Sequence, residues 1–131
     1  MRILPIFLVL AACSQEPPPP AEPERALYAG QGRDRLCVDG DRAGFVTYGA
    51  GNANCSARGK LDRGGAATSI RPDGDEDCRI PVAFSGDRAS LGAGRPTCSY
   101  YCGPGATFDG KSFSRDASAS PAVDFAGDPL C

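Results

Sequence analysis

The chain has 131 residues, including 17 Gly, 12 Pro and seven Cys, and it carries a formal net charge of −2 with no His. This length suits a single domain, and an aromatic content of only 8% predicts a modest core rich in turns. The absence of His excludes a Ser-His-Asp triad and a Cys-His pair, and the scattered Lys and Arg residues argue against nucleic acid as a partner.

The first thirteen residues have the parts of an export signal. Arg2 supplies a positive charge, and the apolar run 3–12 is far shorter than the roughly 20 residues that a membrane-spanning helix needs. Leu10-Ala11-Ala12-Cys13 resembles the lipobox of bacterial lipoproteins. The resemblance implies a signal peptide over residues 1–12, acyl chains such as palmitate on Cys13, and a lipid-anchored protein of the cell envelope. Ser14 after the cysteine implies the outer membrane, with the domain facing the periplasm.

Residues 13–25 then form the lipidated cysteine and a proline-rich linker, SQEPPPPAEPER after Cys13. Four consecutive prolines favour extended polyproline II, which advances about 3.1 Å per residue. We therefore expect a spacer that holds one folded domain, residues 26–131, away from the membrane.

The composition changes after the linker, where short extended runs alternate with glycine-containing turns. The runs are residues 35–38, 44–48, 55–58, 67–70, 79–84 and 88–91. Turns such as Asp39-Gly40 and Gly86-Asp87 are typical of hairpins, because glycine accepts the positive φ that these turns need. The pattern predicts an all-β domain, a small antiparallel barrel or sandwich of short hairpins, with a solenoid of roughly 20-residue repeats as the alternative.

Six cysteines remain after Cys13 is set aside: Cys37, Cys55, Cys78, Cys98, Cys102 and Cys131. An even number in an oxidising compartment predicts disulfides, each stabilising the domain by about 2–4 kcal/mol. The spacing does not decide the pairing, although we expect Cys131 to bond with Cys98 or Cys102 and so fasten the C-terminal tail. A zinc site is the alternative, but the Cys-x2-Cys knuckles and His residues of such sites are missing, so we predict no cofactor.

Two segments match known motifs in form. Residues 105–112 fit the phosphate-loop pattern G-x4-G-K-S, which works only between a strand and a helix, so a turn at Asp109-Gly110 is the preferred interpretation. Asp73, Asp75 and Asp77 alternate like the start of a calcium-binding EF-hand loop. That loop needs Gly where Cys78 stands, so these aspartates are weak calcium candidates and a polar turn is preferred.

Tyr100 and Tyr101 lie between Cys98 and Cys102. Disulfides at both ends would fix this short loop and present one ring outward as a binding residue. The preferred interpretation, however, places one ring in the core and the other over it.

Together these features predict a non-catalytic, membrane-anchored lipoprotein that is a binding or structural module with an envelope protein as its partner. Size, anchor and cysteine-containing hairpins resemble the small β-barrel lipoproteins that inhibit lysozyme in Gram-negative periplasms. That resemblance implies lysozyme inhibition without assigning the role to any residue. A small hydrolase or a calcium-binding domain is the alternative, and the lack of His and of a paired acid and base argues against an enzyme.

Overall fold

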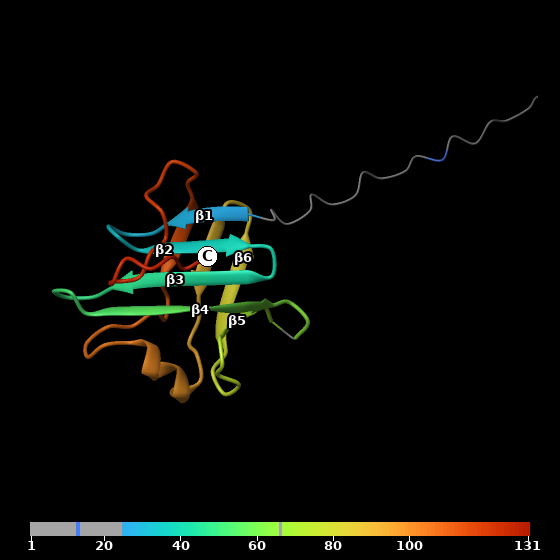
Figure 1. Ribbon diagram of the computed structural model, residues 1–131. Coiled ribbons are helices and arrows are strands. Elements are labelled where there is room, and N and C mark those ends of the chain that lie inside the picture. Colours follow the sequence, from blue (N-terminus) through green and yellow to red (C-terminus); the bar gives the residue numbers. More distant parts are fainter. Residues whose placement is uncertain (1–12, 14–24, 66) are drawn as a thin grey trace, which may run out of the picture.

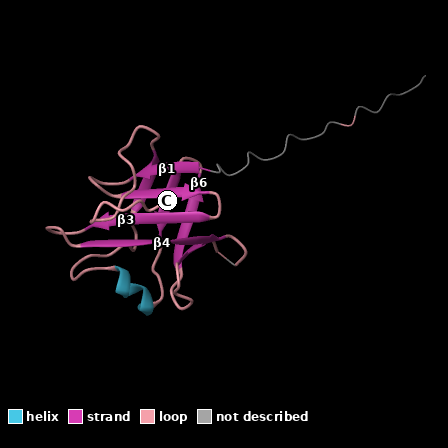
Figure 2. Cartoon of the chain, in the orientation of Figure 1, coloured by secondary structure: helices cyan, strands magenta, loops and turns pink. Residues whose placement is uncertain are grey.

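The computed structural model describes Cys13 and residues 25–65 and 67–131. Eight strands in these residues form one antiparallel sheet that closes on itself, each strand pairing with the next and the last with the first (Figures 1 and 2). The strands are β1 (Arg25–Ala29), β2 (Arg35–Asp39), β3 (Arg42–Tyr48), β4 (Asn54–Asp62), β5 (Ser69–Pro72), β6 (Ile80–Ser85), β7 (Arg88–Leu91) and β8 (Ser112–Arg115). The all-β prediction is confirmed, and closure makes the domain a barrel and not a sandwich.

Alternation along the strands separates the interior of the barrel from its surface. In β4, Cys55, Ala57 and Leu61 are buried, whereas Arg58 and Lys60 between them are exposed. The largest fully buried side chains are Phe45, Phe113, Leu36, Ile70 and Ile80. An eight-stranded barrel is just wide enough for side chains to fill it, so its interior is a packed core.

Two of the predicted turns close tight hairpins. Asp39 pairs with Arg42 and Ser85 pairs with Arg88, which leaves two residues in each loop. Gly40 and Gly86 begin these loops with φ values of 62° and 56°. Positive φ is strained for other residues, so glycine at these positions sets the register of both strand pairs.

The predicted disulfides form, but not all with the expected partners. Cys37 bonds with Cys131, Cys55 with Cys102 and Cys78 with Cys98. The expectation that Cys131 bonds with Cys98 or Cys102 was wrong. Cys55 and Cys78 belong to the interior core with Cys98, whereas Cys37 packs in a second cluster outside the barrel, where the chain ends.

The C-terminal tail (residues 116–131) crosses the outer face of β2 and β3 (Figure 1). Its Ala122 and Leu130 form a small second core with Cys37 and Val46. Gly44 lies beneath the tail, where a Cβ atom would stand only 2.9 Å from the Cβ of Leu130. Glycine in β3 therefore permits the close approach of the tail.

One helix interrupts the strands in the described residues, the short 3-10 helix η1 (Pro96–Tyr101). Its proline stands at the start of the helix. An N–H group at that position would have no partner within the helix, so the lack of one in proline costs no hydrogen bond. Over the same part of the chain, no helix has the length and apolar character needed to cross a bilayer.

Candidate functional site

Tyr100 and Tyr101 end the η1 helix, which two disulfides hold in place. Cys98 within η1 bonds with Cys78, and Cys102 directly after it bonds with Cys55 on β4. The Tyr100 side chain is 85% exposed, whereas Tyr101 packs against the interior core. The two rings meet edge to face, with their centroids 5.3 Å apart. One ring thus projects into solvent from a turn that is covalently fixed at both ends.

Tyr101 also ties this turn to the aspartate-rich segment. Its hydroxyl donates a 2.7 Å hydrogen bond to Oδ2 of Asp75. Partial burial, followed by this hydrogen bond, raises the pKa of Tyr101 to about 12, and the same bond lowers the pKa of Asp75. The backbone N–H groups of Asp77 and Cys78 donate to Oδ1 of Asp75, so this carboxylate holds its own turn together.

The calcium candidates face different partners. Asp73 accepts two hydrogen bonds from the Arg42 guanidinium, one of 2.7 Å, and these bonds lower its pKa. Asp75 is engaged by Tyr101, and the backbone carbonyl of Asp77 accepts from the Thr97 hydroxyl. In residues 25–65 and 67–131 with Cys13, no three His, Cys, Asp or Glu side chains gather where they could hold a metal ion.

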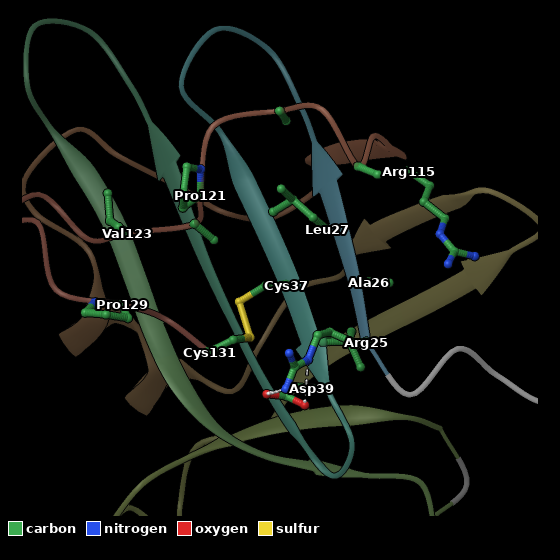
Figure 3. Close-up of a pocket in the computed structure, with 14 residues that line it drawn as sticks. Arg25, Ala26, Leu27, Cys37, Asp39, Arg115, Pro121, Val123, Pro129 and Cys131 are labelled. Atoms are coloured by element: carbon green, nitrogen blue, oxygen red, sulfur yellow. Dashed lines mark hydrogen bonds and ion pairs between the residues drawn. A yellow bond between two sulfur atoms is a disulfide. The ribbon is translucent and has the colours of Figure 1, made fainter.

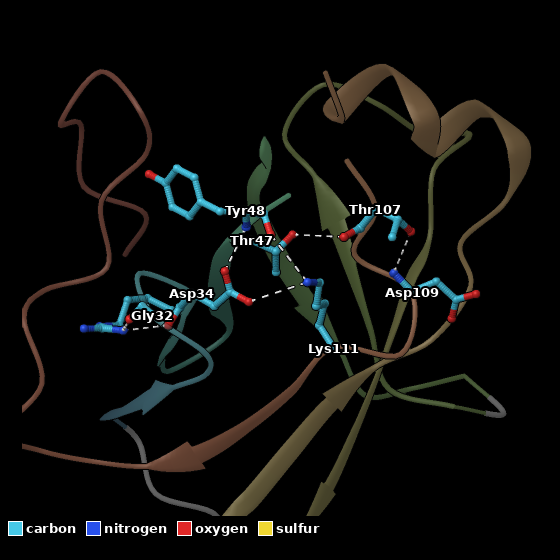
Figure 4. A network of polar contacts seen from close by, with 8 residues as sticks. Gly32, Asp34, Thr47, Tyr48, Thr107, Asp109 and Lys111 are labelled. Carbon is cyan, nitrogen blue, oxygen red and sulfur yellow. Dashed lines mark hydrogen bonds and ion pairs between the residues drawn. The ribbon is translucent and has the colours of Figure 1, made fainter. Parts of the chain in front are cut away.

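The segment that matches the phosphate loop is a turn that leads into a strand. Gly105 and Gly110 have φ values of 82° and 77°, and β8 begins at Ser112. A phosphate loop needs a helix at that point, because the helical N–H groups hold the phosphate. Lys111 instead points toward Asp34, with 3.9 Å between Nζ and Oδ2, and donates to the carbonyl of Tyr48 at 3.4 Å (Figure 4).

Asp34 is the centre of that polar network. It is only 3% exposed, and its Oδ1 accepts the backbone N–H of Tyr48 at 2.8 Å. Thr47, which is fully buried, donates its hydroxyl to the carbonyl of Thr107 at 3.4 Å (Figure 4). The network ties the β1–β2 turn and the end of β3 to the segment before β8. Sequence reasoning missed Asp34, because a single aspartate in a turn carries no distinguishing signal.

A groove of about 710 Å³ lies outside the barrel, between the outer surface of β1 and β2 and the C-terminal tail (Figure 3). Arg25, Asp39 and Arg115 are its charged residues, and all the others that line it have apolar side chains. Arg25 and Asp39 form an exposed pair with 3.4 Å between nitrogen and oxygen. Sequence reasoning missed this groove, because its walls come from the two ends of the domain.

Cys13 is exposed and forms no disulfide. The predicted signal peptide (1–12) and all of the linker between Cys13 and Arg25 lie outside the described residues. Arg25, the last residue of the predicted linker, is the first residue of β1.

Comparisons with protein families, curated proteins and solved structures find no match to this chain.

Proposed function

We propose that this protein is a non-catalytic binding module of the cell envelope, anchored by a lipid on Cys13, with Tyr100 as its principal contact residue. The supporting observation is the 85% exposure of Tyr100 on a turn that two disulfides fix. Tyrosine brings a large amphipathic surface to an interface, and a rigid turn loses little conformational entropy on binding. A tyrosine displayed in this way suits a protein partner in the envelope.

Capture from a bacterial envelope extract tests the contact residue. The full chain and its Tyr100→Ala and Lys60→Ala variants would be immobilised side by side. Lys60 is an exposed residue of β4 and is the matched control. We expect a partner that the parent and Lys60→Ala retain and that Tyr100→Ala retains at least tenfold less, since central aromatic contacts commonly contribute 2 kcal/mol or more. Equal recovery by all three chains contradicts the role of Tyr100.

The anchor is tested separately by fractionation. Cys13→Ala removes the thiol that would carry the lipid and should move the protein from the membrane pellet to the soluble fraction. Ser14→Ala, the neighbouring change, should leave the protein in the pellet. If Cys13→Ala also stays in the pellet, the lipid anchor is excluded. Circular dichroism of both variants checks that the barrel is unchanged.

A second candidate function is inhibition of lysozyme. It is favoured by the closed barrel with three disulfides, which agrees with the resemblance to the small β-barrel lipoproteins that inhibit this enzyme. The purified chain would be added to lysozyme during lysis of a bacterial suspension. Loss of lytic activity at equimolar protein supports inhibition, and full activity at a large excess excludes it.

A further inference from the structure

The groove beside the C-terminal tail differs from the tyrosine turn in its chemistry. Its floor is the outer face of β1 and β2, where Leu27 projects, and one wall is formed by Pro121, Val123 and Pro129 of the tail (Figure 3). Its volume of about 710 Å³ falls within the roughly 300–1,000 Å³ of small-molecule sites. The barrel interior is filled by side chains, so a small ligand would bind on the outside.

The distribution of charge around this groove is uneven. At the end of the groove near Cys131, the charge of Arg25 is paired with that of Asp39 (Figure 3). Arg115 lies on the other side of β1 from the tail wall, and in the described residues its guanidinium makes no hydrogen bond or ion pair. Arginine has five N–H donors in a planar fork that matches a carboxylate. Among the described residues, this end of the groove therefore offers a cation without an anion.

We propose that the groove binds a single-chain fatty acid, with its carboxylate on Arg115 and its acyl chain across Leu27 toward the tail wall. A ligand with an anionic head and an apolar body matches both the Arg115 guanidinium, which pairs with no described residue, and the apolar lining. A single chain fits because the floor consists of two strands, which lie about 4.8 Å apart in a sheet. This inference is independent of the proposed protein partner, since Tyr100 does not line the groove.

The Cys37–Cys131 disulfide gives the site its rigidity. Both cysteines line the groove, and the bond fastens the tail wall to β2 (Figure 3). Arg35 adds a second attachment by donating to the carbonyl and hydroxyl oxygens of Ser120, at 3.1 and 2.9 Å. The wall is thus held before a ligand arrives, which lowers the entropic cost of binding.

Titration with dodecanoate tests the site, with dodecyltrimethylammonium as the cationic probe of equal chain length. The full chain would carry Cys13→Ser, so that no acyl group on that residue competes, and binding would be measured by calorimetry below the micellar concentration. We expect saturable 1:1 binding of dodecanoate and at least tenfold weaker binding of the cation. Comparable affinity for both probes overturns the proposal.

Variants locate the binding. Arg115→Gln should weaken dodecanoate binding about tenfold, the effect of losing a charge-assisted hydrogen bond. Val123→Glu places a carboxylate on the half-exposed tail wall and should abolish binding without disturbing the interior core. Arg88→Gln, an exposed arginine of β7 outside the groove, is the control and should bind as the parent does. Unchanged binding in both Arg115→Gln and Val123→Glu contradicts the proposed site.

Discussion

The phenol of Tyr101 donates a 2.7 Å hydrogen bond to the carboxylate of Asp75, across 26 positions of the sequence. The bond joins the end of η1 to the β5–β6 loop. The Cys78–Cys98 disulfide links the same two segments. The outward position of Tyr100 therefore depends on a covalent and a polar attachment together.

This bond predicts an alkaline titration for Tyr101. Its pKa is raised from 10.0 to about 12, first by burial and then by the hydrogen bond to Asp75. Because the folded-state pKa is the higher one, the stabilisation is complete below pH 10.0 and is lost as pH rises through about 12. Ultraviolet difference titration of the parent against Tyr101→Phe should show a phenolate midpoint near 12.

Asp75→Asn is the second arm of that experiment. It removes the negative charge and the strong acceptor, so the Tyr101 midpoint should move down toward 10.0. Asp73→Asn, which breaks the pair with Arg42 and leaves the tyrosine alone, should not move it. A midpoint near 10.0 in the parent would disprove the hydrogen bond in solution.

Gly44→Val is predicted to displace the C-terminal tail. Its side chain would occupy the space of Leu130 and force the tail away from β3, at a cost of about 1–3 kcal/mol in unfolding free energy. Chemical denaturation measures this loss. Gly65→Ala is the control, because its Cβ would lie 3.6 Å from the nearest atom, an ordinary contact. Equal stability of the two variants contradicts the packing described for the tail.

Cys37→Ala with Cys131→Ala should loosen the tail and leave the barrel closed. The disulfide spans 94 positions, so the chain-entropy argument puts the cost of its removal at about 4–5 kcal/mol. Hydrogen exchange should show fast exchange at Leu130, whose N–H bonds to the carbonyl of Ala122, and continued protection within β4. Uniform loss of protection across both segments would mean that the tail and the barrel unfold as one unit.

Lys111→Met is predicted to destabilise the barrel by about 1–3 kcal/mol, because it leaves the buried Asp34 carboxylate without its cation. The double change Asp34→Asn with Lys111→Met removes both charges and should recover much of that loss. A double-mutant cycle in denaturant measures the coupling between the two residues. Strictly additive losses would show that Asp34 is compensated by the Tyr48 N–H alone.

Local features of the sequence predicted much of the fold. Each of the six predicted extended runs overlaps a strand. The reason is that β-branched residues favour strands, and glycines favour turns, through their effect on the backbone of only a few neighbouring residues. β1 and β8 were missed. β1 is joined to the proline-rich segment, and β8 follows a glycine turn with only one large apolar residue, Phe113. These two strands close the barrel by pairing with each other.

Like the strands, some candidate sites could be predicted from the sequence and others could not. The sequence indicated Tyr100 and Tyr101 together as possible binding residues, because cysteines on either side of a short loop indicate a fixed turn. Only the structure shows that Tyr100 is the exposed ring of the two. The groove and the Asp34 network were not found, since Leu27 and Arg115, or Asp34 and Lys111, are far apart in the chain. Their proximity follows from the pairing of β1 with β8 and from the course of the tail.

An all-β domain with short hairpins and an even set of six cysteines could be predicted from the order of the residues, because turn chemistry depends on neighbouring residues and cysteine number on composition. Three features could be known only from the folded chain: the sheet closes, Cys131 bonds with Cys37, and the tail forms one wall of a groove on the outside of the barrel. These features depend on which surfaces approach one another over long sequence separations. Such approaches are set by packing, as the contact of Gly44 with Leu130 illustrates, and local preference does not encode them.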